Sequence, residues 1–229
     1  MSRSIAIDGA RRGEVNEPTT LRLERAQITD LSEIGRMTSL RELILTRTPV
    51  SDLTPLAGLT NLETLGLRLT RITDLTPLAG LTRLRNLIVS FTEVRDLSPL
   101  AGLTRLESCH LTGTLIEDVA PLSGLVNLMR LDLGGTRIAD IEPLRPLTKL
   151  QGLQLAGTRV RDLSPLQGMT DLRFLDLGDT PVADITPLGR LTSLREIDLR
   201  GTRVTDIAPR ATLSGCAIIT ATNPRRRRR

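Results

Sequence analysis

The amino-acid sequence repeats itself every 22 residues from Met37 to Thr212 without an insertion. For instance, LTNLETLGLRLTRITDLTPLAG (59–80) is followed at once by LTRLRNLIVSFTEVRDLSPLAG (81–102). A fixed period of this length is the signature of a solenoid, in which each unit stacks on its neighbours. One continuous array is therefore predicted, although the chain length alone would allow two domains. The eight full units begin at Met37, Leu59, Leu81, Leu103, Leu125, Leu147, Met169 and Leu191.

Each unit has the same apolar pattern, with apolar residues at places 1, 4, 7, 9, 14, 17 and 20 when Met37 is place 1. Places 6 to 10 alternate in polarity, as a strand with one buried face requires. The motif that follows, such as DLTPLAG (74–80), predicts one short helical turn, because Asp can cap, Pro suits a first turn and Gly ends the segment. Since one strand cannot bury its apolar face alone, the units are expected to stack into a parallel sheet.

Partial units extend the array in both directions. The stretch 19–36 fits the later places of a preceding unit, and 213–221 fits the early places of a last one. We therefore predict an N-terminal cap segment over 1–18, a solenoid over 19–224 with its full repeats at 37–212, and a basic tail over 225–229. The count places Cys216 at inward place 4 of the last unit, with Ile219 and Ala221 further along its strand.

The pattern LTxLxxLxLxxxxIxDLxPLxG resembles the leucine-rich repeat family, and over about 19–221 it is most similar to the bacterial internalin type. The resemblance implies an α/β solenoid with a parallel concave sheet, short helical turns on the convex side, and a protein partner bound in the concave face. One difference concerns place 12, where the family usually has Asn and this chain has Thr. The amide of Asn offers two hydrogen-bond donors, whereas the hydroxyl of Thr offers one. This chain has Thr48, Thr70, Thr92, Thr114, Thr136, Thr158, Thr180 and Thr202.

The basic charge of the chain is concentrated at its C-terminal end. Of 31 Lys and Arg residues, five lie at 225–229, and the remaining 26 equal the 26 acidic residues. The body therefore offers no net basic charge for nucleic acid. The run forms a separate candidate anion-binding site for nucleic acid or an anionic membrane surface, with the solenoid as scaffold, unless it only aids solubility. Its residues are Arg225, Arg226, Arg227, Arg228 and Arg229.

Several classes of site and location are disfavoured by what the sequence lacks. No signal peptide or 18-residue apolar run is seen, so we expect a cytoplasmic protein, with secretion by a leaderless route left open. No phosphate-cradling glycine loop, HExxH motif or CxxC pair occurs, so neither a cofactor nor a metal is predicted. Cys109 and Cys216 lie five units apart, roughly 24 Å, which is beyond disulfide reach. Both are interpreted as small buried side chains.

Places 5, 6, 8, 10 and 11 lie on or beside the exposed side of each strand, so the fold is expected to leave them free. Place 8 changes from apolar to acidic along the array: Ile44, Gly66, Ile88, His110, Asp132, Gln154, Asp176 and Asp198. We predict a partner-binding face centred on an apolar patch of Ile44, Leu69, Ile88 and Phe91. It continues through His110, Asp132, Asp176, Asp198 and Arg200. The alternative is an ordinary surface with scattered apolar residues.

Two groups of carboxylates invite other interpretations. Asp176 and Asp198 meet at the same place of adjacent strands, where like charges repel, so a basic region of the partner is predicted. Calcium is the alternative, but two carboxylates fall short of the six to eight oxygens that it takes. Place 16 carries a second acidic column, interpreted as local caps of the helical turns. It consists of Asp52, Asp74, Asp96, Asp118, Asp140, Asp162, Asp184 and Asp206.

A hydrolase is a remote alternative, because Ser108, His110 and Asp132 are the residue types of a nucleophile, a base and an orienter. Ser108 and His110 are expected about 7 Å apart along one strand, and an open sheet supplies neither an oxyanion hole nor a dry pocket. We therefore predict a non-enzymatic protein-protein interaction module. A homodimer through the C-terminal edge strand is a further expectation, because terminal repeats need a polar cap.

Overall fold

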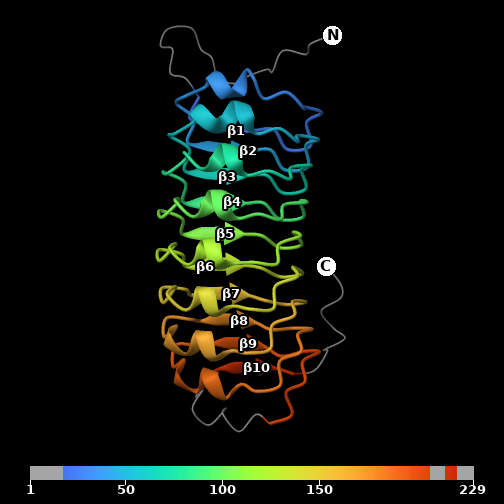
Figure 1. Ribbon diagram of the computed structural model, residues 1–229, viewed down its shortest axis with the longest axis vertical. Helices are drawn as coiled ribbons and strands as arrows, with labels where there is room; N and C mark the ends of the chain where they lie inside the picture. The colour runs from blue at the N-terminus through green and yellow to red at the C-terminus, as the bar shows by residue number, and fades with distance from the viewer. Residues whose placement is uncertain (1–17, 207–214, 221–229) are drawn as a thin grey trace.

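The computed structural model describes residues 18–206 and 215–220, and within these ranges ten short parallel strands form one open sheet (Figure 1). The strands follow one another in chain order across the sheet. This arrangement confirms the predicted α/β solenoid. The strands are β1 (Thr20–Arg22), β2 (Glu42–Ile44), β3 (Thr64–Gly66), β4 (Asn86–Ile88), β5 (Ser108–His110), β6 (Arg130–Asp132), β7 (Gly152–Gln154), β8 (Phe174–Asp176), β9 (Glu196–Asp198) and β10 (Ala217–Ile219).

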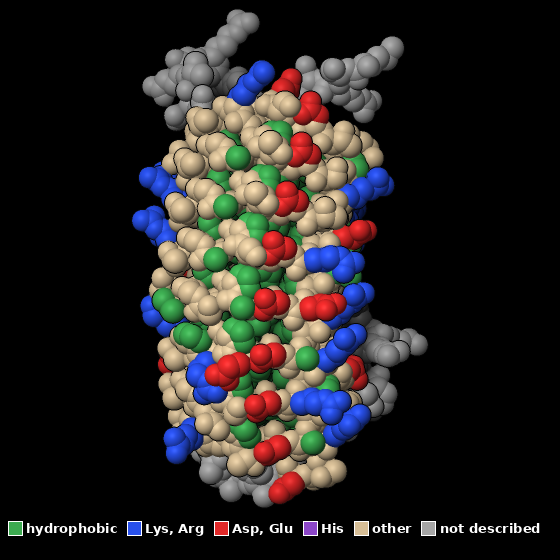
Figure 2. All heavy atoms as spheres, in the orientation of Figure 1, with side chains coloured by type: hydrophobic (Ala, Val, Ile, Leu, Met, Phe, Trp, Pro, Cys, Tyr) green, Lys and Arg blue, Asp and Glu red, His purple; other side chains and the backbone are tan. Residues whose placement is uncertain are grey.

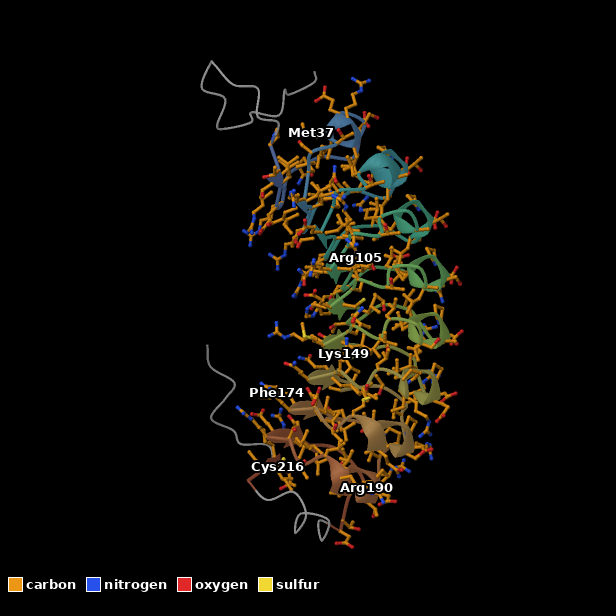
Figure 3. The ribbon with its side chains drawn as sticks, turned by 90° about the vertical axis from the view of Figure 1, so that its left-hand side faces the viewer. Met37, Arg105, Lys149, Phe174, Arg190 and Cys216 are labelled. Carbon is orange, nitrogen blue, oxygen red and sulfur yellow. The ribbon has the colours of Figure 1, made fainter. Side chains whose placement is uncertain are left out.

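A short 3-10 helix follows each of the first eight strands and lies on the outer, convex side of the array, opposite the sheet (Figure 3). The prediction of one short helical turn per unit is thus confirmed, and from η2 onward each helix has a proline in its first turn. No helix in the described ranges is long and apolar enough to cross a bilayer. The helices are η1 (Ile34–Arg36), η2 (Thr54–Gly58), η3 (Thr76–Leu78), η4 (Ser98–Leu100), η5 (Ala120–Leu122), η6 (Glu142–Leu144), η7 (Ser164–Gly168) and η8 (Thr186–Arg190).

The core is one continuous column of aliphatic side chains between the sheet and the helices. Strand β4 shows how the alternation works, since Leu87 is completely buried while Asn86 and Ile88 are half-buried on the other face. Cys109 occupies the place of Leu87 in the next strand, and burial raises the pKa of its thiol to about 12. Cys216 is buried as well, and both cysteines are free, as predicted.

The last strand departs from the predicted register by one residue. Ala217 pairs with Glu196, which lies 21 residues earlier, and Ile218 therefore pairs with Ile197. Ile218 packs against the core, whereas Ile219 lies on the concave face. The places predicted for Cys216 and Ile219 are wrong, because the period loses one residue between β9 and β10.

Threonine at place 12 stabilises the turn that follows each strand. Its hydroxyl donates to the carbonyl oxygen of place 9 in the same unit at 2.6 to 2.7 Å, from Thr48 through Thr202. In seven of the eight units the threonine amide donates to the same carbonyl, as Thr114 N does to Leu111 O at 3.2 Å. Among the described residues no buried side-chain polar atom lacks a partner. In the described units, threonine therefore substitutes for the usual Asn without leaving a buried side-chain polar atom unpaired.

Place 11, just before this threonine, has a positive φ in all nine units where the structure describes it. The residues are Arg25, Arg47, Leu69, Phe91, Gly113, Gly135, Gly157, Asp179 and Gly201, with φ between 55° and 71°. In this conformation a Cβ approaches the following carbonyl oxygen, and only glycine avoids the cost. The prediction that the fold leaves place 11 free is wrong for the backbone, although the side chains of Leu69 and Phe91 are exposed.

Gly157→Ala tests this backbone requirement. The added Cβ would lie 3.7 Å from the nearest atoms, in Gly135, which is an ordinary contact, so any loss comes from the φ of 68°. We expect the free energy of unfolding, measured by chemical denaturation, to fall by about 1 to 2 kcal/mol. Gly152→Ala is the matched control, because it lies in β7 with empty space around its Cβ and no positive φ. The control should be neutral or gain up to about 1 kcal/mol, and equal losses at both positions would contradict the assignment.

Candidate binding face

The open face of the sheet lies on the concave side of the array, where the strands curve inward and the label of Phe174 is found (Figure 3). Places 6 and 8 project from this face, because place 7 between them points into the core. Two hollows interrupt it. One of about 470 Å³ lies beside Phe91, and the other, of about 530 Å³, lies over β6 to β9.

Phe91 is held in place by the units on both sides of it. The guanidinium carbon of Arg68 lies 4.8 Å from the centroid of the ring, within the range of a cation–π interaction. The ring also packs on Gly113 so closely that a Cβ there would come within 2.7 Å of Phe91 Cδ1. The side chain nevertheless remains 44% exposed, and that of Leu69 is 38% exposed. These contacts orient an apolar surface toward solvent.

The structure brings only part of the predicted apolar patch together. Ile88 and Phe91 line the same hollow, but Ile44 and Leu69 do not. Ile44 lies over Gly66, where an added Cβ would meet its Cδ1 at 2.8 Å. Part of the Ile44 side chain thus covers the neighbouring strand, and the residue is half-buried.

Ser108 and His110 converge more closely than the strand spacing suggested. Ser108 Oγ lies 3.0 Å from His110 Nε2, because both side chains rise from the same face and lean together. His110 Nδ1 is 3.9 Å from Asp132 Oδ2, which is too long for a hydrogen bond. A catalytic triad needs both contacts, so the geometry supplies only one half of what a hydrolase requires.

The acidic residues at place 8 have a structural role that the sequence analysis missed. Asp132, Asp176 and Asp198 each accept a hydrogen bond from the amide two residues later, at 2.9 to 3.1 Å. The amides of places 9 and 11 donate to the next unit, as those of Leu177 and Asp179 do. The amide of place 10, which lies between them, points away from the next unit and donates to the carboxylate instead. The repeated DLG of 132–134 and 176–178 is the signal that could have indicated this role.

The three carboxylates differ in how their charge is balanced. Burial disfavours ionised Asp198, but Arg200, whose Nε lies 2.9 and 2.8 Å from its two oxygens, outweighs this and holds the pKa below its ordinary value. Burial likewise opposes ionisation of Asp132, yet contacts from His110 and Thr112 lower its pKa. Partial burial raises the pKa of Asp176, and Asp198 adds to the shift.

Arg200 therefore does not project freely toward a partner, because it pairs with Asp198. This pair also reduces the repulsion that was predicted between Asp176 and Asp198. Among the described residues, no Lys or Arg side chain forms an ion pair with Asp176. Asp176 is thus the one carboxylate of the three without a basic or imidazole neighbour in contact.

The larger hollow contains two residues that the sequence analysis did not select. Phe174 is 53% exposed, more than any other large apolar side chain in the described ranges. Gly152 lies beside it in the neighbouring strand, and no atom outside residues 151–153 lies within 4 Å of the position of its Cβ. Both occupy place 6, as does Arg130, and an aromatic residue at this outward place is the signal that could have identified the hollow.

The second acidic column is structural, as predicted. Its side chains run down the helix-bearing face of the molecule (Figure 2), and the seven from Asp52 to Asp184 each accept a hydrogen bond at 2.8 Å from the amide two residues later. Hydrogen bonds from the side chain and amide of Thr54 lower the pKa of Asp52. In the described part of the chain, no group of three or more His, Cys, Asp or Glu side chains is placed to hold a metal ion.

Asp176→Asn should stabilise the protein at neutral pH. The folded-state pKa of Asp176 is raised, so ionisation costs more in the folded than in the unfolded state, and this penalty is fully present above the folded pKa. The asparagine oxygen can still accept from Gly178. We expect a higher thermal midpoint than wild type at pH 7 and convergence at about pH 3, where aspartic acids are protonated in both states.

Asp52→Asn is the control of opposite sign. Its lowered pKa contributes stability that is present above the unfolded-state pKa and is lost as the pH falls through the folded pKa. This variant should therefore melt below wild type at pH 7. A lower midpoint for Asp176→Asn at pH 7 would show that its carboxylate is needed in the charged form.

Comparison with known proteins identifies the family. A model described as "Leucine Rich repeats (2 copies)" matches residues 38–80 and 148–190. Among solved structures, an internalin C2 (inlC2) from Listeria monocytogenes is 34% identical, with a TM-score of 0.78 over 82% of this chain and 84% of that chain. An internalin (inlF) from the same organism is 30% identical, with a TM-score of 0.75 over 86% and 72%.

A leucine-rich repeat protein of Leptospira interrogans shares the fold, with 22% identity and a TM-score of 0.78 over 83% of this chain and 51% of that chain. A search of curated proteins finds no match. The two internalins, at 30% identity or more, are matched over most of their length. The chain therefore belongs to the leucine-rich repeat family and is internalin-like.

Proposed function

We propose that the chain is a non-enzymatic module that binds a partner protein through its concave face, with Phe91 and Leu69 at the contact. Leucine-rich repeat proteins generally mediate protein–protein interaction. What carries the finer assignment is one observation: two bulky, exposed apolar side chains occupy a place with positive φ.

The energetic argument compares units at the same place. Glycine fills place 11 in four other units and a charged residue in three, so the fold itself requires no apolar side chain there; these residues are Gly113, Gly135, Gly157 and Gly201, and Arg25, Arg47 and Asp179. A left-handed residue with a Cβ costs roughly 1 to 2 kcal/mol, and a side chain that stays about 40% exposed recovers only part of this by burial. Strain of this kind concentrates at binding positions. Burial against a partner would remove from water the part of the Leu69 and Phe91 side chains that is exposed in the free chain.

The composition of the face indicates how such a contact would gain affinity. The chain has no Trp or Tyr, the residue types that with Arg dominate interface energetics. Phe91 stacked with Arg68 supplies a preorganised apolar and cationic surface in their place. Preorganised side chains lose less rotamer entropy on binding. We infer that affinity comes from contact area and from these oriented groups.

Phe91→Asp should abolish capture of the partner and leave the fold intact. Asp179 occupies the same place with a φ of 55°, so Asp is compatible with this backbone. The measurement is a pull-down from an extract of the source cell with the retained proteins identified by mass spectrometry, together with thermal melting of each variant. By comparison, Leu87→Ala in the core should cost about 2 to 5 kcal/mol.

Val126→Asp is the matched control, because Val126 is also 44% exposed but lies at place 2, outside the strand face. It should retain the partner. Loss of the same protein from both variants would indicate a general effect of added charge, and unfolding of Phe91→Asp would refute the facing of place 11.

The basic run is the alternative binding element, and Arg225 to Arg229 lie outside the described residues. Deleting 225–229 separates the two functions. If the concave face binds the partner, the truncated chain should still capture it, with at most slower association. If the run binds polyanions, that binding should weaken with salt at a log-log slope of about −0.7 to −0.9 per contact and vanish on deletion. Loss of the protein partner on deletion, with Phe91→Asp harmless, would favour the run.

A further inference from the structure

A vacant slot lies on the floor of the larger hollow, over Gly152 in β7. The register aligns Arg130, Gly152 and Phe174 side by side on β6, β7 and β8. Outside residues 151–153, no atom lies within 4 Å of the position of a Cβ on Gly152. The missing side chain therefore leaves a gap between two large neighbours, and all three residues line the hollow of about 530 Å³.

The width of the gap suits one flat group. Adjacent strands are about 4.8 Å apart, so the Cα atoms of Arg130 and Phe174 are separated by roughly 9.6 Å. Two stacking contacts of about 3.5 Å each fit within this span. A planar side chain can thus enter between the guanidinium of Arg130 and the ring of Phe174. Both wall side chains are exposed and have no interaction with each other that would close the gap.

The wall and floor chemistry selects among planar groups. Arg130 favours the face of an aromatic ring, through a cation–π interaction, over another cation. Phe174 offers aromatic stacking on the opposite side. The same hollow is lined by Gln154 and Asp176, whose oxygens can accept a hydrogen bond from a ring N–H or O–H. Asp176 has no basic partner in contact, so its second oxygen is available.

We propose that this slot receives a tryptophan or tyrosine side chain of the partner protein, stacked between Arg130 and Phe174 and donating a hydrogen bond to the floor. This inference rests on the proposed function and specifies the chemistry of the partner. The chain has neither Trp nor Tyr, so a second copy of this chain cannot be the occupant. An aliphatic side chain would leave the floor acceptors unpaired, and a lysine or arginine would face Arg130 and Arg173, which also lines the hollow.

The absence of tryptophan from the chain makes a direct binding test possible. N-acetyltryptophanamide is titrated with the full chain, and its fluorescence is followed without any background from the protein. We expect saturable binding with a blue-shifted emission, and amide shifts in an NMR titration that centre on Gly152. N-acetylleucinamide and N-acetylargininamide, followed by the same NMR shifts, should bind about tenfold more weakly or not at all.

Two variants address the walls and the gap. Gly152→Val fills the slot, and because its Cβ meets empty space in a strand, the thermal midpoint should stay equal to or above that of wild type. This variant should no longer bind N-acetyltryptophanamide. Phe174→Leu removes the stacking wall and should weaken binding about tenfold. Thr64→Val, at the same place of β3, is the matched control and should bind like wild type.

The outcomes distinguish this inference from the proposed function. Preference for the arginine probe, equal binding of leucine, or unchanged binding by Gly152→Val would each overturn the aromatic slot. If Phe91→Asp loses the protein partner while Gly152→Val retains it, the concave-face function holds and the slot assignment fails. Loss of the partner from both variants, with saturable tryptophan binding in wild type, supports the two together. If neither variant loses the partner, both proposals fail.

Discussion

The hydrogen bond from the place-12 threonine to the place-9 carbonyl is the interaction on which the rest of the structure depends. In Thr114, for example, the hydroxyl lies 2.7 Å from Leu111 O and the amide nitrogen lies 3.2 Å from it. In seven of the eight units hydroxyl and amide come from one residue and bind one carbonyl within the same unit, while the amide of place 11 donates to the next unit. Place 11 lies within this turn, has a positive φ in every unit where it is described, and carries its side chain beside the concave face. Scaffold and candidate contact therefore share a single turn, and Phe91 is oriented by the bond that ends its strand.

The concave face combines structural and available groups within the same columns. Asp198 is committed twice, to the amide and to the guanidinium of Arg200. Asp176 caps an amide with one oxygen and has no ion pair for the other, which explains why burial raises its pKa while that of Asp198 is lowered. A column of like residues thus differs in availability from strand to strand. Such differences depend on one neighbour, place 10, where Gly178 and Arg200 stand in successive units.

The period, the buried places and the capping role of the second acidic column could all be predicted from the sequence, because each depends on spacing within one unit. What could not be predicted depends on neighbours across units or on backbone angles. The positive φ of Phe91 leaves no trace in polarity, and the shift of Ile218 into the core follows from one residue lost after β9. Ser108 and His110 converge because their rotamers lean together. Phe174 was visible in the sequence, but its importance depends on the empty space over Gly152.

The two hollows are parts of one surface, since His110 and Asp132 line both. Phe91 follows β4 and Gly152 lies in β7, so the apolar contact and the slot are three strand spacings apart, roughly 14 Å. An extended segment covers that distance with about four to five residues. A partner held at a single point could rotate about it, whereas two separated anchors fix its direction along the array. His110 and Asp132, which lie between the two anchors, contribute little apolar area. They can disfavour partners that place an apolar side chain over them, because their polar atoms would lose water without gaining a hydrogen bond. Specificity would then come from the spacing of two aromatic contacts across a polar centre, a property that no single repeat possesses.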